Sequence, residues 1–134
     1  MPAPSKAALA AWLDAYVRLW NAGDREAWLE NHRKLVTGEV TMEDPVGTRH
    51  KRGVEACFEE PWQRFNSNTK FHLRDVFICG SEVAFVNDNH WTHDGKTSVG
   101  TSIEIYRFGA DGSLAIRTWW EVPRDREIMR EYVA

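Results

Sequence analysis

The feature that most constrains the fold of this chain is a change in hydrophobic period near residue 70. Before that point apolar residues recur at steps of three and four, as in amphipathic helices; after it they alternate with polar residues, as in strands. The connections between the later segments are short, and Asp94-Gly95 is a strong hairpin signal. The pattern predicts an antiparallel meander with strands over about 70–78, 82–93, 97–108 and 113–122.

The first half of the chain supplies helices that can cover one face of this sheet. Ser5 caps a predicted helix over residues 6–22, and Asp24 caps a second one through about residue 34. A third helix is predicted over residues 54–60, where Pro61 breaks or kinks it because proline lacks a backbone N–H. A short charged helix is expected over 124–134. Together these elements predict a single α+β domain spanning residues 1–134.

Composition excludes several kinds of partner. A formal net charge of −3 gives no basic field for nucleic acid or for an anionic membrane. The first predicted helix is amphipathic rather than continuously apolar, so we expect neither a signal peptide nor a membrane span. Two cysteines, Cys57 and Cys79, and the lack of clustered Cys and His spacings predict no disulfide framework, no metal site and a cytoplasmic location. His32, on the second helix, is expected at the surface or at the rim of a pocket.

The segment around Asp44 points to chemistry. On a strand over residues 40–44, Val40, Met42 and Asp44 share a face that is otherwise apolar. Burial disfavours a charged carboxylate and raises its pKa toward the range in which it can act as a base at neutral pH. Pro45 ends the strand, so Asp44 lies at its mouth, where catalytic side chains are common. The alternative is a solvated turn aspartate, since Asp-Pro is ordinary turn chemistry.

Three segments of the chain resemble the ketosteroid isomerases, which form part of the NTF2-like superfamily. The order of helices and strands is similar as well, and the resemblance spans residues 8 to 121. It implies an NTF2-like cone, in which a curved antiparallel sheet wraps around the N-terminal helices. The matching segments are Tyr16-Val17 to Asn21-Ala22-Gly23-Asp24, then Glu43-Asp44-Pro45-Val46-Gly47, and the strand that ends Ile103-Glu104-Ile105-Tyr106-Arg107-Phe108.

The resemblance implies cofactor-independent proton transfer that moves a C=C bond in a hydrophobic carbonyl compound such as a steroid. Asp44 takes the place of the family's base, and Tyr16 and Glu104 take the places of its two hydrogen-bond donors to the carbonyl oxygen. That family is itself a standard example of carboxyl groups tuned by their surroundings, so these roles are carried over from it. Glu104 donates only when protonated, which requires an apolar surrounding that raises its pKa.

The chain departs from the family at several positions that are expected to shape the pocket. Glu104 is one methylene longer than the family's aspartic acid, and the family's second pocket tyrosine falls near Pro61-Trp62, so the hydrogen-bond support of Tyr16 is missing or altered. Asparagines stand where apolar or aromatic side chains are expected, which predicts a more polar cavity. The expected substrate-binding residues are Trp62, Asn87, Asn89, Trp91 and Trp120.

Two other functions fit the same fold. Trp120-Glu121-Val122 is similar to the tryptophan–carboxylate pair of SnoaL-like polyketide cyclases, although the strand alternation turns Glu121 away from Trp120. A histidine dyad would suit a dehydratase, but His72, His90 and His93 do not fall at that family's position.

The third possibility is a module that binds a small molecule without catalysis. An open apolar cavity in which Tyr16, Asp44 and Glu104 converge favours an enzyme, whereas a cone filled by tryptophan rings favours a structural role. The expected partners are a small hydrophobic carbonyl ligand and a second copy of the chain. The predicted dimer contact is the convex sheet face with Ile103, Ile105 and Trp119.

Overall fold

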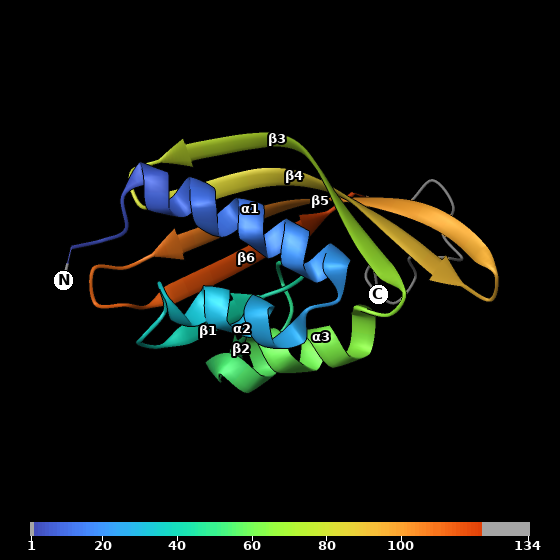
Figure 1. Ribbon diagram of the computed structural model, residues 1–134, viewed down its shortest axis with the longest axis horizontal. Helices are drawn as coiled ribbons and strands as arrows, with labels where there is room; N and C mark the ends of the chain where they lie inside the picture. The colour runs from blue at the N-terminus through green and yellow to red at the C-terminus, as the bar shows by residue number, and fades with distance from the viewer. Residues whose placement is uncertain (1, 122–134) are drawn as a thin grey trace.

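The computed structural model describes residues 2–121, so the helix expected over 124–134 and the last residue of the strand expected over 113–122 lie outside the described part. Figure 1 shows the order of the elements along the chain. The helical elements are α1 (Lys6–Ala22), α2 (Arg25–Arg33), a π-helix (Glu55–Glu59) and α3 (Glu60–Phe65). The strands are β1 (Val40–Glu43), β2 (Lys51–Arg52), β3 (Thr69–Cys79), β4 (Glu82–His93), β5 (Lys96–Phe108) and β6 (Leu114–Trp120).

The strands form one six-stranded sheet in the order β2-β1-β6-β5-β4-β3. Strands β3 to β6 are antiparallel neighbours, as the alternation predicts. Strand β1 runs parallel to β6, with Met42 opposite Ile116, so the sheet is mixed rather than wholly antiparallel. The long connection between these two strands, which contains the third helical segment and the meander, allows β1 to run in the same direction as β6.

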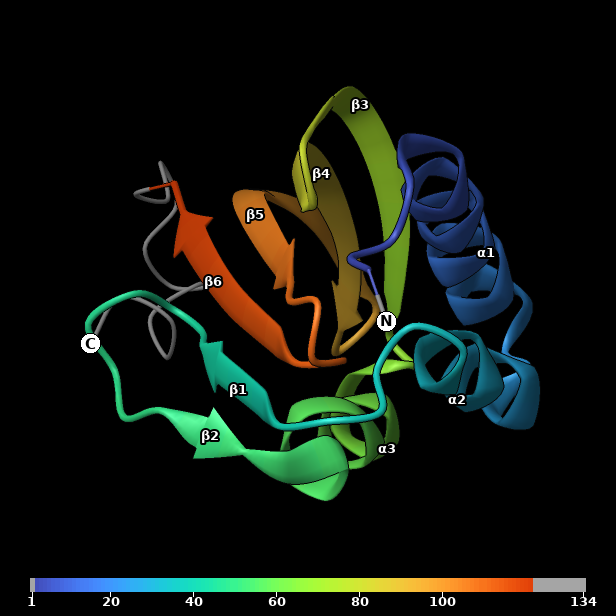
Figure 2. The ribbon, with the colours of Figure 1, turned by 90° about the vertical axis from the view of Figure 1, so that its left-hand side faces the viewer.

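The sheet curves around the helices to give the open NTF2-like cone. In Figure 2, α1 lies beside β3, α2 lies below α1, and α3 lies to the right of β1 and β2. Phe85 and Phe108 come from the sheet and are 1% exposed, and their rings contact Tyr16 and Trp12 of α1. The ring of Trp20 on α1 stacks on Phe71 of β3 with centroids 4.5 Å apart. Aromatic contacts of this kind attach α1 to the concave face of the sheet.

The chain stays helical through Pro61, where the sequence predicts a break or a kink followed by a short continuation with Trp62 and Phe65. The preceding turn is a π-helix, in which the backbone N–H of Glu60 donates to the carbonyl of Glu55. Helix α3 follows directly, with Pro61 in its first turn, where the fixed φ of proline suits a helix. The two segments therefore form one continuous helical wall beneath the sheet.

His32 is a core residue and not a rim residue. Its side chain is 2% exposed, and its Nδ1 accepts a hydrogen bond from the indole N–H of Trp12 at 3.2 Å. The imidazole stacks on Phe58 with ring centroids 3.9 Å apart. Burial lowers the pKa of His32 to about 3, so its ring is neutral at physiological pH.

Candidate active site

A pocket of about 100 Å³ opens between α1, the helical wall that ends in α3 and the concave face of the sheet. This volume is several times the roughly 10–15 Å³ that a single water molecule needs. Tryptophan rings line the pocket without filling it, and its wall is mainly apolar. The charged side chains among its lining residues are Asp44, Lys51 and Glu104.

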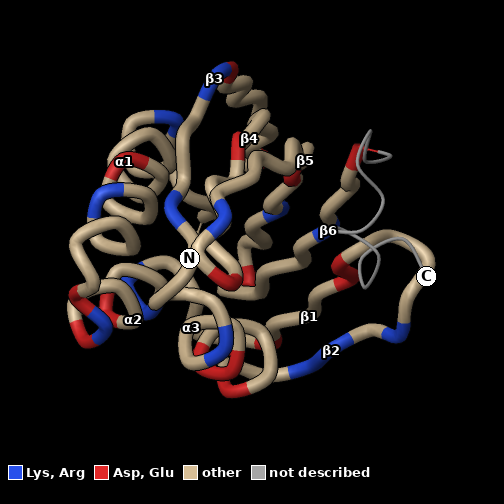
Figure 3. Tube along the Cα trace, turned by 90° about the vertical axis from the view of Figure 1, so that its right-hand side faces the viewer, with Lys and Arg blue, Asp and Glu red and all other residues tan. Residues whose placement is uncertain are grey.

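Asp44 lies directly after β1 and lines the pocket. The loop that follows is tied to β6 because the backbone N–H of Val46 donates to the carbonyl of Thr118 at 2.8 Å. The indole N–H of Trp120 donates to Oδ1 of Asp44 at 2.9 Å. Burial raises the pKa of Asp44, against the opposing effects of this hydrogen bond and of the positive charge of Lys51. Figure 3 shows the basic positions on β2 that bring this charge beside β1.

Glu104 projects from β5 into the same pocket and is 8% exposed. Burial and the negative charge of Asp44 raise its pKa to about 7, while the hydrogen bond from Ser102 and the nearby polar groups of Asn87 and Tyr106 act in the opposite direction. Near neutral pH the carboxyl of Glu104 is therefore present in both its protonated and its ionised form. The two carboxyl groups of the pocket thus differ in how readily they hold a proton.

Tyr16 projects from α1, and its hydroxyl oxygen accepts a hydrogen bond from the hydroxyl of Tyr106 at 3.2 Å. Burial raises the pKa of both tyrosines well above the usual value, so both stay protonated. The support for Tyr16 thus comes from β5 and not from the Pro61-Trp62 region. Tyr106 is not among the residues expected at the site from the sequence, although strand alternation places it on the same face as Glu104.

Two of the five residues expected to bind substrate do not line this pocket. Trp62 packs in the core with its ring edge-on to Trp20, at 5.1 Å between centroids. Asn87 is fully buried and donates to Oδ1 of Asn89 at 3.0 Å. Asn89 does line the pocket, but its amide nitrogen is used inside the protein, where it donates to the carbonyl of Gly100 at 3.0 Å. The cavity is therefore less polar than the two asparagines suggested.

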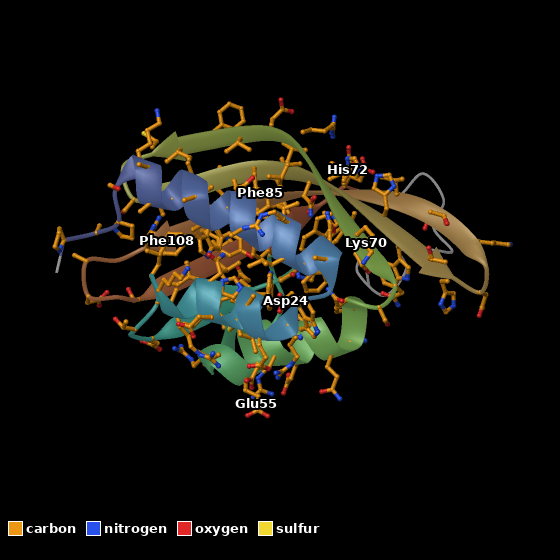
Figure 4. The ribbon with its side chains drawn as sticks, in the orientation of Figure 1. Asp24, Glu55, Lys70, His72, Phe85 and Phe108 are labelled. Atoms are coloured by element: carbon orange, nitrogen blue, oxygen red, sulfur yellow. The ribbon has the colours of Figure 1, made fainter. Side chains whose placement is uncertain are left out.

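Trp91 and Trp120 do line the pocket. Glu121, which was considered with Trp120 for a cyclase, does not line it, and neither do the histidines considered for a dehydratase, His72, His90 and His93. Glu121 is exposed, and its carboxylate accepts a hydrogen bond from the backbone N–H of Thr101 at 3.3 Å. His72 and His90 face each other with ring centroids 4.9 Å apart, and Figure 4 shows His72 away from the helices.

Two structural findings concern metal and membrane binding. Within residues 2–121 there is no group of three or more His, Cys, Asp or Glu side chains that could hold a metal ion. The helices of the described part are all too short or too polar to cross a membrane.

The structure resembles several solved structures of the same fold. SalBIII, an epoxide hydrolase/cyclase-like enzyme in pyran ring formation in polyether salinomycin, matches with a TM-score of 0.67 and 21% identity over 84% of this chain and 90% of that chain. A putative SnoaL-like polyketide cyclase from Shewanella denitrificans OS-217 matches with a TM-score of 0.67 and 12% identity over 96% and 98%. A computationally designed 17-OHP binder matches with a TM-score of 0.66 and 22% identity over 86% and 92%.

These identities are low, so the structural matches show the fold alone. Comparison with curated proteins found no match. The family of SnoaL-like domains, in contrast, matches residues 13–117. Because this match covers most of the chain, the protein belongs to the family of SnoaL-like domains.

Proposed function

We propose that this protein catalyses cofactor-independent proton transfer on a hydrophobic carbonyl compound, with isomerisation of a C=C bond as its reaction. The observation that carries the proposal is the pair of carboxyl groups, Asp44 and Glu104, which line one mainly apolar pocket and both have raised pKa values. Perturbed carboxyl groups in a cleft are enriched at catalytic sites. The hydroxyl of Tyr16 in the same pocket supplies a donor that stays protonated.

In the proposed reaction, the ionised carboxylate of Asp44 takes a proton from the carbon next to the substrate carbonyl. The electron pair of the broken C–H bond forms a new C=C bond, and the carbonyl electrons move onto oxygen, which gives a conjugated enolate. Asp44 then returns the proton to the far carbon of the conjugated system, so the enzyme ends unchanged. The raised pKa of Asp44 makes it a better proton acceptor than an exposed aspartate.

The negative oxygen of the enolate needs hydrogen-bond donors that are already in place. Tyr16 can offer its own proton, because its oxygen accepts the proton of Tyr106. Glu104 offers a second proton when its carboxyl is protonated. One such donor in a dry site is worth about 3 kcal/mol of transition-state stabilisation.

The decisive experiment follows the isomerisation of a β,γ-unsaturated 3-ketosteroid by ultraviolet absorbance. Asp44→Asn keeps the shape of the side chain and is expected to lower the rate by about 10²–10⁴-fold, the usual contribution of a general base. Glu43→Gln is the matched control, because Glu43 binds Arg117 and His50 outside the pocket. Equal rates for wild type and Asp44→Asn would remove Asp44 as the base.

Ring closure of a polyketide is the second candidate, and the family match favours it. It shares the first step, because an enolate formed by Asp44 can attack a second carbonyl of the same substrate and close a ring. Exchange of the α-protons of a cyclic ketone in D₂O, followed by NMR, detects this common step. Exchange without steroid isomerisation would favour ring closure, whereas ligand binding without exchange would favour the non-catalytic binding module.

A further inference from the structure

Glu104 stands at the end of a line of buried hydrogen bonds that runs along the concave face of β4 and β5. The amide nitrogen of Asn87 donates to Oδ1 of Asn89, and the amide nitrogen of Asn89 donates to Oγ of Ser102, each at 3.0 Å. The hydroxyl of Ser102 then donates to Oε2 of Glu104 at 3.0 Å. The three residues before Glu104 are all buried, at 0%, 4% and 0% exposure. We refer to Asn87, Asn89 and Ser102 as the polar line.

Backbone groups fix the direction of the hydrogen bonds in the polar line. The backbone N–H of His72 donates to Oδ1 of Asn87 at 3.0 Å, and because an N–H can only donate, it orients this amide. The carbonyl of Gly100 accepts from the amide nitrogen of Asn89 at 3.0 Å, and because a carbonyl can only accept, it orients the second amide in the same sense. The backbone carbonyl of Asn87 also accepts from the amide nitrogen of Asn89, at 3.2 Å, so two N–H groups serve three acceptors. Ser102 faces this donor, so its own proton is directed to Glu104.

This direction distinguishes the two oxygens of Glu104. Oε2 accepts the proton of Ser102 whether Glu104 is ionised or protonated. A protonated carboxyl carries its hydrogen on one oxygen, and the oxygen left for it is Oε1.

We propose that Asn87, Asn89 and Ser102 are positioning residues, which reserve Oε2 of Glu104 as a hydrogen-bond acceptor and leave Oε1 as the oxygen that presents a proton to the ligand. The inference rests on the proposed function for the role of that proton. The polar line gives the protonated carboxyl of Glu104 a fixed orientation as a hydrogen-bond donor. The two asparagines therefore act through Glu104 and do not contact the ligand.

The electrostatic surroundings of Glu104 are consistent with this role. The ionisable groups that face it are Asp44 from the end of β1, Tyr16 from α1 and Tyr106 on β5. Burial and the charge of Asp44 hold its pKa above the usual value, while the hydrogen bond from Ser102 and the nearby amide of Asn87 stabilise the ionised form and lower it. Loss of the Ser102 hydroxyl therefore shifts the pKa of Glu104 upward.

The test is a ¹³C NMR titration of the full-length protein labelled in its glutamate carboxyl groups, with Glu104→Gln used to assign the resonance. Ser102→Ala is expected to raise the pKa of Glu104 by about one to two, because a hydrogen bond to a charged group has about that effect. Ser102→Thr keeps a hydroxyl and is expected to restore the wild-type pKa. Thr101→Ala is the matched control, because its hydroxyl donates to Asp88, at 2.7 Å, and not to Glu104.

An unchanged pKa in Ser102→Ala would overturn the proposal, and so would equal rises in the alanine and threonine variants, which would point to packing and not to the hydroxyl. If the alanine variant fails to fold, Ser102→Cys keeps the size of the side chain with a weaker donor and is expected to give a smaller rise. The titration needs no substrate. If the Ser102 variants show the expected pKa shifts but the wild type does not turn over the steroid, the proposed reaction is rejected and the positioning role is retained.

Discussion

The hydroxyl of Tyr106 donates a hydrogen bond to the hydroxyl of Tyr16 at 3.2 Å, across 90 positions of sequence. One tyrosine comes from α1 and the other from the concave face of β5, so the contact depends on how the helix packs against the sheet. Because Tyr106 supplies the proton between the two oxygens, the proton of Tyr16 is available to a ligand. This arrangement makes Tyr106 a supporting residue for the proposed donor.

Tyr106→Phe removes this support and leaves the ring in the core. We expect the isomerisation rate to fall roughly 5- to 10-fold, since a typical hydrogen bond is worth about 1 kcal/mol, while Tyr16→Phe lowers it about 10²–10³-fold. The rates of both single variants and of the double variant form a cycle. If Tyr106 acts through Tyr16, the double variant is no slower than Tyr16→Phe; fully additive losses would show an independent role.

The pH dependence of kcat/KM should be bell-shaped. Asp44 has to be ionised, and its raised pKa places the acid limb above the usual range for aspartate. Glu104 has to be protonated to donate, so activity is expected to fall as pH rises through about 7. Glu104→Gln keeps a donor that does not titrate and should remove the alkaline limb alone. An alkaline limb that persists in Glu104→Gln would contradict the role of Glu104 as the titrating donor.

Sequence patterns predict those parts of the fold and of the candidate site that depend on local periodicity. Alternation gives the antiparallel strands β3 to β6 and places Glu104 and Tyr106 on one face. The parallel pairing of β1 with β6 has no local signal, because the two strands are far apart in sequence. The irregular register between Leu73 and Asp75 in β3 is equally invisible to a simple count of alternating residues.

Buried polar residues show more clearly what a sequence pattern cannot predict. Alternation puts Asn87 and Asn89 in register with Trp91, but it cannot tell whether an amide binds a ligand or another protein group. The structure shows that their hydrogen bonds are made to each other, to the backbone and to Ser102. His32 is a similar case, since its burial depends on the aromatic rings that several elements bring around it.

Thr118→Val is expected to stabilise the protein. The Thr118 hydroxyl is buried and has no hydrogen-bond partner among residues 2–121. An unsatisfied buried polar group costs about 1–3 kcal/mol, and valine has nearly the same shape, so the free energy of unfolding should rise by about that amount. Thr69→Val is the control, since the Thr69 hydroxyl donates to Asn68 at 2.9 Å and its loss should destabilise. Urea unfolding curves of both variants give the comparison; a destabilised Thr118→Val would show that this hydroxyl has a partner.

Protonation of His32 should destabilise the fold in acid. Its pKa is about 6.5 in the unfolded chain and about 3 in the folded protein, so the unfolded state binds the proton more tightly. The contribution of neutral His32 to the free energy of unfolding is therefore fully present above pH 6.5. It is lost as the pH falls toward 3, by up to about 5 kcal/mol. His32→Gln keeps an acceptor for Trp12 but does not titrate, and its unfolding free energy should depend less steeply on pH in this range. Identical slopes for the two proteins would show that another group controls acid unfolding.

The convex face of the sheet is expected to mediate a homodimer. On this face Ile103 is 48% exposed and pairs across strands with Trp119, and Phe77 of β3 is 64% exposed. Adjacent exposed apolar side chains of this kind are typical of an interface between copies. Ile103→Glu places charge at the predicted contact and should shift the protein from dimer to monomer in sedimentation velocity experiments. Val54→Glu is the control, since Val54 is 38% exposed and lies between β2 and the π-helix, not on β3 or β5. A wild type that stays monomeric at high concentration would contradict this prediction.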